Sequence, residues 1–216
     1  MSEPVIRAAD FNDAEFVAWT MQAAARSHLN RGWLDIALDR PESECLEFLR
    51  RLALAETRSF CHNSLFLVAE VDGQAVSALC RYPAVGGDGY PLMIPAMNEV
   101  AHSYGWGEAE ISAMWKRLEY GSLCAMTASE DCWIIENVAT LPRYRRRGLT
   151  GMLIKRALDD GRAHGSKEAQ ITFAIGNEPA QRAYSKAGFS FTEERRHRDY
   201  EAACGSPGVR RFTRPL

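Results

Sequence analysis

The stretch from residue 132 to residue 151 constrains the fold more than any other part of the chain. Cys132-Trp-Ile-Ile-Glu-Asn-Val-Ala-Thr140 has the apolar composition of a buried strand. Leu141-Pro142 ends that strand, and the chain enters the basic, glycine-containing segment Arg145-Arg-Arg-Gly-Leu-Thr-Gly151. Apolar residues then recur at helical spacing as far as Gly165, a plausible helix stop. The sequence therefore predicts a strand, a basic loop and a helix in direct succession.

The rest of the chain predicts further strands and helices around this unit. Asp72-Gly73 joins two strand-like runs and is a strong hairpin signal. Asn12 and Glu15 have the spacing of a capping box, which predicts a helix there, and Pro41 suits the first turn of a second helix. Other strands are expected at 5–8, 65–71, 75–80, 168–175, 189–192 and 209–213, and other helices around Ile111 and over 179–187. This order predicts an α/β (α+β) fold with a mixed sheet and helices on both faces.

The length of 216 residues suits one domain over 1–216, because no repeat or low-complexity linker divides the chain. Residues 83–130 stand between the third and fourth expected strands as an insert. Its first part, Pro83 to Pro95, is rich in glycine and proline and is expected to be a loop.

Composition excludes several classes of function. The formal net charge of −2 argues against a nucleic-acid partner. No apolar run approaches the roughly 18 residues of a membrane helix, and the N-terminus lacks a signal-peptide pattern. The six cysteines form no Cys-x-x-Cys pair and several lie in apolar runs, which favours free thiols in a reducing, cytoplasmic setting. The five histidines show no metal-ligand spacing, so no metal is expected.

The basic loop has the properties of an anion site. A helix N-terminus presents unpaired N–H groups, glycine allows close approach, and arginine adds charge-assisted hydrogen bonds. Neither a Walker loop nor a dinucleotide fingerprint is present. From the loop alone, phosphate binding and a solvated basic turn both remain open.

Two motifs together resemble a known family. Val138-Ala-Thr-Leu-Pro-Arg-Tyr-Arg-Arg-Arg-Gly-Leu-Thr-Gly-Met-Leu153 is similar to the signature of GNAT N-acyltransferases, Gln/Arg-x-x-Gly-x-Gly/Ala. Arg145 and Gly148 match that pattern, whereas Thr150 stands where Gly or Ala is usual. Asn177-Glu-Pro-Ala-Gln-Arg-Ala-Tyr-Ser-Lys-Ala-Gly-Phe189 resembles the family's second motif. The resemblance covers about residues 131–192.

The resemblance implies a mostly antiparallel central sheet whose fourth and fifth strands splay apart to admit coenzyme A. It implies acetyl-CoA as co-substrate, with pantetheine pairing to the backbone of Val138 and Thr140 and pyrophosphate at the basic loop. Asn177 is expected to cap the following helix or to hydrogen-bond the pantetheine arm, two roles that are compatible. The expected coenzyme A residues are Val138, Ala139, Thr140, Arg145, Arg146, Arg147, Gly148, Leu149, Thr150, Gly151, Asn177 and Ala180.

Two residues are candidates for proton transfer. Glu136 could remove a proton from the attacking amine, and in a regular strand its side chain shares a face with that of Val138, whose amide would stabilise the developing oxyanion. An ion pair with a nearby arginine is the alternative for Glu136. Tyr184 stands at the family's general-acid position, with core packing as the alternative.

The sequence thus predicts an N-acetyltransferase that moves an acetyl group from acetyl-CoA to a primary amine by direct transfer in a ternary complex. A non-catalytic acyl-CoA sensor or regulatory domain is the second hypothesis. A small-molecule amine is the expected acceptor, protein amines stay open, and so does a homodimer. Trp106, Trp115 and Trp133 either line an acceptor pocket or pack in the core.

Overall fold

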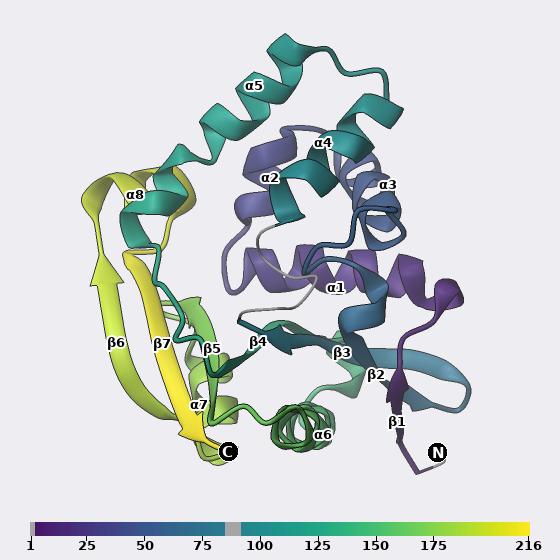
Figure 1. Cartoon of the computed structure of the whole chain (residues 1–216), viewed down its shortest axis with the longest axis vertical. Coiled ribbons are helices and arrows are strands. Elements are labelled where there is room, and N and C mark those ends of the chain that lie inside the picture. The colour runs from purple at the N-terminus through teal and green to yellow at the C-terminus, as the bar shows by residue number, and fades with distance from the viewer. Residues whose placement is uncertain (1–2, 85–91) are drawn as a thin grey trace.

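The computed structural model describes residues 3–84 and 92–216 and has one sheet of seven strands in the order β1-β2-β3-β4-β5-β7-β6 (Figure 1). The strands are β1 (Val5–Ala8), β2 (Phe66–Val71), β3 (Gln74–Pro83), β4 (Cys132–Thr140), β5 (Glu168–Ala174), β6 (Ser190–Arg196) and β7 (Gly208–Pro215). Neighbouring strands are antiparallel except for β4 and β5, which are parallel. The predicted mixed, mostly antiparallel sheet is confirmed.

The β4–β5 pair separates part-way along its length. Pairing joins residues 132–135 of β4 to residues 168–171 of β5 and goes no further. From Glu136 onward, β4 keeps its partner β3, and β5 continues alongside β7. Figure 1 shows β5, β7 and β6 turning away from the other four strands. The fourth and fifth strands are therefore splayed, as expected.

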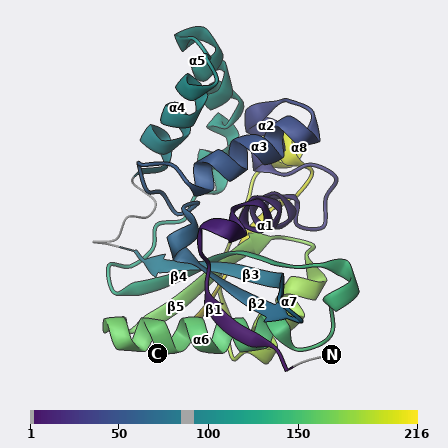
Figure 2. The same cartoon turned by 90° about the vertical axis from the view of Figure 1, so that its right-hand side faces the viewer.

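Helices cover both faces of the sheet. They are α1 (Ala14–Arg26), α2 (Trp33–Leu38), α3 (Glu42–Ala53), α4 (Met93–Ser103), α5 (Glu108–Arg117), α6 (Leu149–His164), α7 (Glu178–Lys186) and α8 (Arg198–Cys204). Figure 2 shows α1 to α5 on one side of the sheet and α6 on the other. Each side has its own apolar core, one centred on residues such as Met21, Phe48 and Leu52 and the other on Leu153, Ile154 and Leu158. The prediction of helices on both faces is confirmed.

The hairpin between β2 and β3 follows from its two turn residues. Val71 pairs with Gln74, so the loop consists of Asp72 and Gly73 alone. Their φ angles of 51° and 77° are both positive, as a type I′ turn requires. The Asp-Gly hairpin prediction is therefore confirmed.

The expected cap of the first helix was misplaced by two residues. The capping box is formed by Asp10 and Asp13 around the 3₁₀ turn η1 (Phe11–Asp13), and α1 begins at Ala14. The Asp10 carboxylate accepts from the Asn12 amide at 2.8 Å, and the Asp13 carboxylate accepts from the Asp10 amide at 2.8 Å. Carboxylates are strong N-caps, so Asp10 takes the position that Asn12 was expected to hold.

Three helices were not expected: α2, α4 and α8. α4 begins at Met93, inside the stretch expected to be a loop up to Pro95. Pro95 lies in the first turn of α4, where its missing N–H has no intrahelical partner to lose. Residues 85–91 of that expected loop lie outside the described residues.

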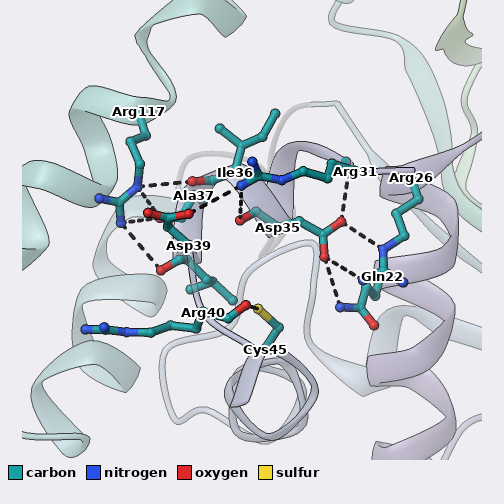
Figure 3. A network of polar contacts seen from close by, with 12 residues as sticks. Gln22, Arg26, Arg31, Asp35, Ile36, Ala37, Asp39, Arg40, Cys45 and Arg117 are labelled. Atoms are coloured by element: carbon teal, nitrogen blue, oxygen red, sulfur yellow. Dashed lines mark hydrogen bonds and ion pairs between the residues drawn. The ribbon is translucent and has the colours of Figure 1, made fainter. Parts of the chain in front are cut away.

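A polar network joins α1 and α2 to α5 (Figure 3). Asp35 of α2, only 8% exposed, accepts from Arg26 of α1 at 2.8 and 2.9 Å and from Gln22 at 3.1 Å. Arg117 of α5 donates to the carbonyl oxygens of Ile36, Ala37 and Leu38 at the end of α2. These contacts fix α5 against α2, and α2 against α1.

Candidate active site

A large cavity of about 2760 Å³ passes through the opening between β4 and β5. Its wall includes residues 136–140 of β4, residues 170–174 of β5 and the segment 144–151 that leads into α6. The end of α1 and parts of α4, α5 and α7 complete the wall. The two motifs that resemble the GNAT signature therefore meet at one cavity, on both sides of the separated strands.

A β-bulge lies at the point where β4 leaves β5. Ala78 of β3 pairs with Ala139, and Cys80 pairs with Glu136, so one residue of β3 faces two of β4. Asn137 is one of those two and has a φ of 50°. The extra residue reverses the alternation of side chains beyond it. The bulge therefore determines which face of the sheet each side chain in the second half of β4 lies on.

The bulge corrects one expectation about Glu136. Val138 packs against the core on the α6 side, whereas Glu136 lies on the opposite face with Tyr82. The prediction that the two side chains share a face is wrong, because it assumed a regular strand. Both residues still line the cavity.

Glu136 has one direct polar partner in the described part of the chain. The Tyr82 hydroxyl donates to its Oε2 at 3.0 Å, and no ion pair to an arginine is found there. Burial raises the pKa of Glu136 above its usual value, while the Tyr82 hydrogen bond opposes that rise. A carboxylate with a raised pKa beside a cavity is better suited to accept a proton than an exposed one.

Segment 145–151 opens directly into α6. Gly148 caps the helix with a φ of 79°, and its carbonyl accepts from the Met152 amide at 3.1 Å. At both Gly148 and Gly151, an added Cβ would meet no heavy atom within 4 Å. Arg145, Arg146 and Arg147 are exposed around this space. Open room, free helix-terminal amides and three cations fit a pyrophosphate group.

Thr140 connects the loop to β4. Its carbonyl oxygen accepts from Arg145 Nε at 3.2 Å, and its hydroxyl lies 3.3 Å from that of Thr150 and 2.6 Å from that of Ser77. Thr150 therefore turns its hydroxyl toward the sheet. A row of three hydroxyl groups ties β3, β4 and α6 together at the base of the loop.

Asn177 caps α7 and also reaches α1. Its Oδ1 accepts from the Ala180 amide at 3.2 Å, and its Nδ2 donates to Ser27 Oγ at 2.7 Å. Asn177, Ala180 and Ser27 line the cavity. The capping role is thus confirmed, and the cap joins α7 to the end of α1.

Tyr184 is only 7% exposed and packs edge-on against Phe173, with ring centroids 5.4 Å apart. Burial raises the pKa of Tyr184 above its ordinary value. The residue also lines the cavity, and its hydroxyl has no hydrogen-bond partner among residues 3–84 and 92–216. The Tyr184 ring therefore packs in the core, while its hydroxyl is available for a hydrogen bond to a bound ligand.

The sequence model of the Acetyltransferase (GNAT) family matches residues 30–189, well over half of the chain. The chain belongs to the GNAT acetyltransferase family. The resemblance read from its two motifs is confirmed.

Solved structures share the GNAT fold over nearly the whole chain. One described as an acetyltransferase has a TM-score of 0.72 and 15% identity, covering 98% of this chain and 99% of its own. An N-acetyltransferase from Staphylococcus aureus Mu50 has a TM-score of 0.65 and 18% identity, covering 98% and 100%. A Drosophila melanogaster polyamine N-acetyltransferase that forms N-acetylagmatine has a TM-score of 0.55 and 16% identity, covering 99% and 100%. Among curated protein sequences, none matches this chain significantly.

Several cavity residues of this GNAT protein were missed by sequence reasoning. Tyr82 lies beyond the expected end of its strand at Cys80, although β3 continues to Pro83. Ser27 and His28 follow α1, where no motif marks them, and both line the cavity. Of the three tryptophans considered for an acceptor pocket, Trp115 lines the cavity. Trp106 instead packs on Phe48, and Trp133 is buried in the core on the α6 side.

No group of three or more His, Cys, Asp or Glu side chains that could hold a metal ion occurs within the described ranges. In the same residues, no helix has the length and apolar character needed to cross a membrane. All six cysteines are free, and five of them are buried.

Proposed function

We propose that this GNAT protein transfers an acetyl group from acetyl-CoA to a primary amine, by direct transfer in a ternary complex. The observation that supports this proposal most directly is that one cavity between the splayed strands has the basic loop before α6 on one side and Glu136 on the other. Both substrates would meet at the opening in the sheet. A small-molecule amine is the proposed acceptor, and a protein amine is the alternative within the same chemistry.

The loop residues fit the coenzyme A part of the substrate. Acetyl-CoA supplies the acyl thioester. Arg145, Arg146 and Arg147 would neutralise the phosphates, and the amides from Gly148 to Gly151 would donate hydrogen bonds to them. The unpaired edge of β4 at Val138 and Ala139 would accept the pantetheine arm. The sequence predicted that pantetheine pairs with the backbone of Val138 and Thr140. Because the Thr140 carbonyl already accepts from Arg145, the backbone of Val138 is the better partner for the pantetheine arm.

The transfer requires three proton movements. Glu136 takes the proton that the ammonium group must lose, directly or through a water, so that the neutral amine can attack. The new N–C bond forms as the C–S bond breaks, and the Val138 amide stabilises the negative charge that develops on the carbonyl oxygen. Tyr184 donates its proton to the departing thiolate. As the amide forms, its nitrogen releases a second proton to solvent, and the tyrosinate is reprotonated from solvent, so no other reactant is consumed.

A broad panel of amines tests this function. Release of coenzyme A thiol from acetyl-CoA, dependent on both enzyme and amine, is the expected result. Tight binding of acetyl-CoA with no turnover on any amine would contradict it and favour the second candidate, an acyl-CoA sensor. The Glu136 carboxylate, buried and with Tyr82 as its one hydrogen-bond partner in the described residues, favours the enzyme hypothesis, because binding of acyl-CoA alone does not require a general base.

The cytoplasm is the proposed location, supported by six free thiols. A homodimer is compatible with this proposal but is not required by it, since the cavity wall is formed within one chain.

A further inference from the structure

A row of aromatic rings leads along the cavity wall to Glu136. The Trp33 and Phe60 ring centroids are 6.4 Å apart, and those of Phe60 and Tyr82 are 6.1 Å apart with an interplanar angle of 20°. The Tyr82 hydroxyl then donates to Glu136 at 3.0 Å. All four side chains line the cavity. The row therefore begins at α2 and ends at the proposed catalytic base.

The row is held firmly in place. Phe60 and Tyr82 are 6% and 2% exposed, so both pack in the core as well as lining the cavity. Cys80 Sγ donates to the Phe60 carbonyl at 3.0 Å, which fixes the backbone that carries the ring. Rigid rings lose little conformational entropy when a ligand packs on them.

The surroundings of the row are apolar. Met93, Trp115 and Ile134 contribute to the same wall. The indole N–H of Trp115 is already used, since it donates to Asn98 Oδ1 at 2.8 Å. A ligand in this part of the cavity thus meets hydrocarbon and ring faces.

Carboxylates elsewhere in the cavity are placed differently. Asp159 pairs with Arg162 at 2.7 Å on the α6 side. Glu119 and Glu130 line the cavity but are exposed to solvent. In the described part of the wall, Glu136 is the carboxylate that meets the aromatic row. A second cation on a bound amine would lie against the rings without a buried carboxylate, so that cation–π attraction alone would offset its desolvation.

From this arrangement we infer that the acceptor is a primary amine carried by an aromatic ring on a short alkyl chain. The ammonium group pairs with Glu136, and the ring packs along Trp33 and Phe60. This inference rests on the proposed function and uses the same reaction, in which an N–C bond forms and the thioester C–S bond breaks. Polyamines are its direct competitors.

The test compares kcat/KM at saturating acetyl-CoA for phenylethylamine and tryptamine with that for butylamine, agmatine and spermidine. Ring packing and burial of the ring predict a preference of about tenfold or more for the aromatic amines over butylamine. Faster turnover of agmatine or spermidine than of either aromatic amine would overturn the inference and leave the proposed function intact. Turnover of another amine in the broad panel but of none of these five would overturn the inference alone, whereas failure of the whole panel despite acetyl-CoA binding would overturn the proposed function.

A substitution of Trp33, at the end of the aromatic row farthest from Glu136, provides a second test. Trp33→Ala is expected to lower the ratio of kcat/KM for phenylethylamine to that for butylamine by about fivefold. The ratio cancels differences in the fraction of folded enzyme, so it separates recognition from stability. Trp106→Ala is the matched control, because Trp106 packs on Phe48 and Arg40 away from the cavity and should leave the ratio unchanged. An unchanged ratio in Trp33→Ala would remove the row from substrate recognition.

Discussion

At the scale of single residues, the proposed proton transfer depends on the pair formed by Tyr82 and Glu136. Burial raises the pKa of the Glu136 carboxyl, and the Tyr82 hydrogen bond limits that rise because it favours the charged form. Glu136 was expected from the sequence as a carboxylate next to the proposed oxyanion site. Tyr82 was not, because nothing in the residues around Tyr82 shows that its ring faces β4.

Tyr82→Phe should move the acidic limb of the kcat/KM profile to higher pH. In the proposed mechanism Glu136 acts as a carboxylate, so activity should fall as the pH drops through its pKa, and removal of the Tyr82 donor should raise that pKa further. The measurement is a pH–rate profile of the variant beside the unmodified protein. Tyr104→Phe is the control, since the buried Tyr104 hydroxyl has no hydrogen-bond partner in the described residues. A profile that stays in place would show that Glu136 does not set the acidic limb.

Tyr184→Phe should lower kcat by roughly a hundredfold, within the usual range for loss of a general acid. Coenzyme A affinity should hardly change, because the ring and its contact with Phe173 are retained. Steady-state kinetics and calorimetric titration with coenzyme A measure the two quantities separately. Undiminished turnover would remove Tyr184 from the mechanism and leave it as a core residue.

At the scale of elements, the strand, basic loop and helix over residues 132–164 could be predicted almost to the residue. The structure has β4 over Cys132–Thr140 and α6 over Leu149–His164. The bulge at Asn137 could not be predicted, because apolar residues such as Ile134, Ile135 and Val138 are present on both faces of the strand. The alternation of apolar and polar residues therefore does not indicate where the strand is irregular, and only the pairing with β3 reveals the extra residue.

Gly148→Ala should weaken coenzyme A binding by about tenfold and lower stability by roughly 1 kcal/mol. The φ of 79° disfavours any residue with a Cβ, and the new methyl group would project into the open space at the start of α6. Gly105→Ala is a matched control, because Gly105 has a φ of 77° and open surroundings but lies outside the cavity wall. Both variants should lose a few degrees in Tm, and only Gly148→Ala should lose affinity. Equal affinity in the two variants would argue against phosphate binding at this loop.

At the scale of the whole molecule, the sheet and the position of the two motifs were predictable, and the layer of helices above the sheet was predictable only in part. α2 has six residues, too few for a clear helical period, and it is held by contacts with other helices, from Arg26 of α1 to Asp35 and from Arg117 of α5 to the carbonyl of Ala37. α4 was not predicted from the sequence, because Pro95 in its first turn was interpreted as part of a loop. Contacts between distant segments, such as α5 with α2, leave no local pattern in the sequence.

The same contacts make α4 and α5 part of the proposed acceptor wall. α4 and α5 carry Met93 and Trp115, which line the cavity, and Arg117 fastens α5 to the end of α2, which itself begins with Trp33. Glu99 of α4 accepts from the amides of residues 56 and 57 after α3 at 3.0 Å each, so α4 is fastened as well. We therefore expect the helical layer to control the amine and the α6 side to control coenzyme A.

Arg117→Ala should separate these two halves of the site. It removes charge-assisted hydrogen bonds to three carbonyl oxygens at the end of α2, which costs about 2 kcal/mol of stability and loosens the acceptor wall. The KM for the amine should rise by about fivefold or more, while the KM for acetyl-CoA changes by less than about twofold, because the basic loop and α6 lie on the other face of the sheet. Lys116→Ala, an exposed neighbour on α5, serves as the control and should change neither constant. Equal changes in both KM values would mean that the helical layer acts on the whole site, and the division of the cavity between its two faces would have to be abandoned.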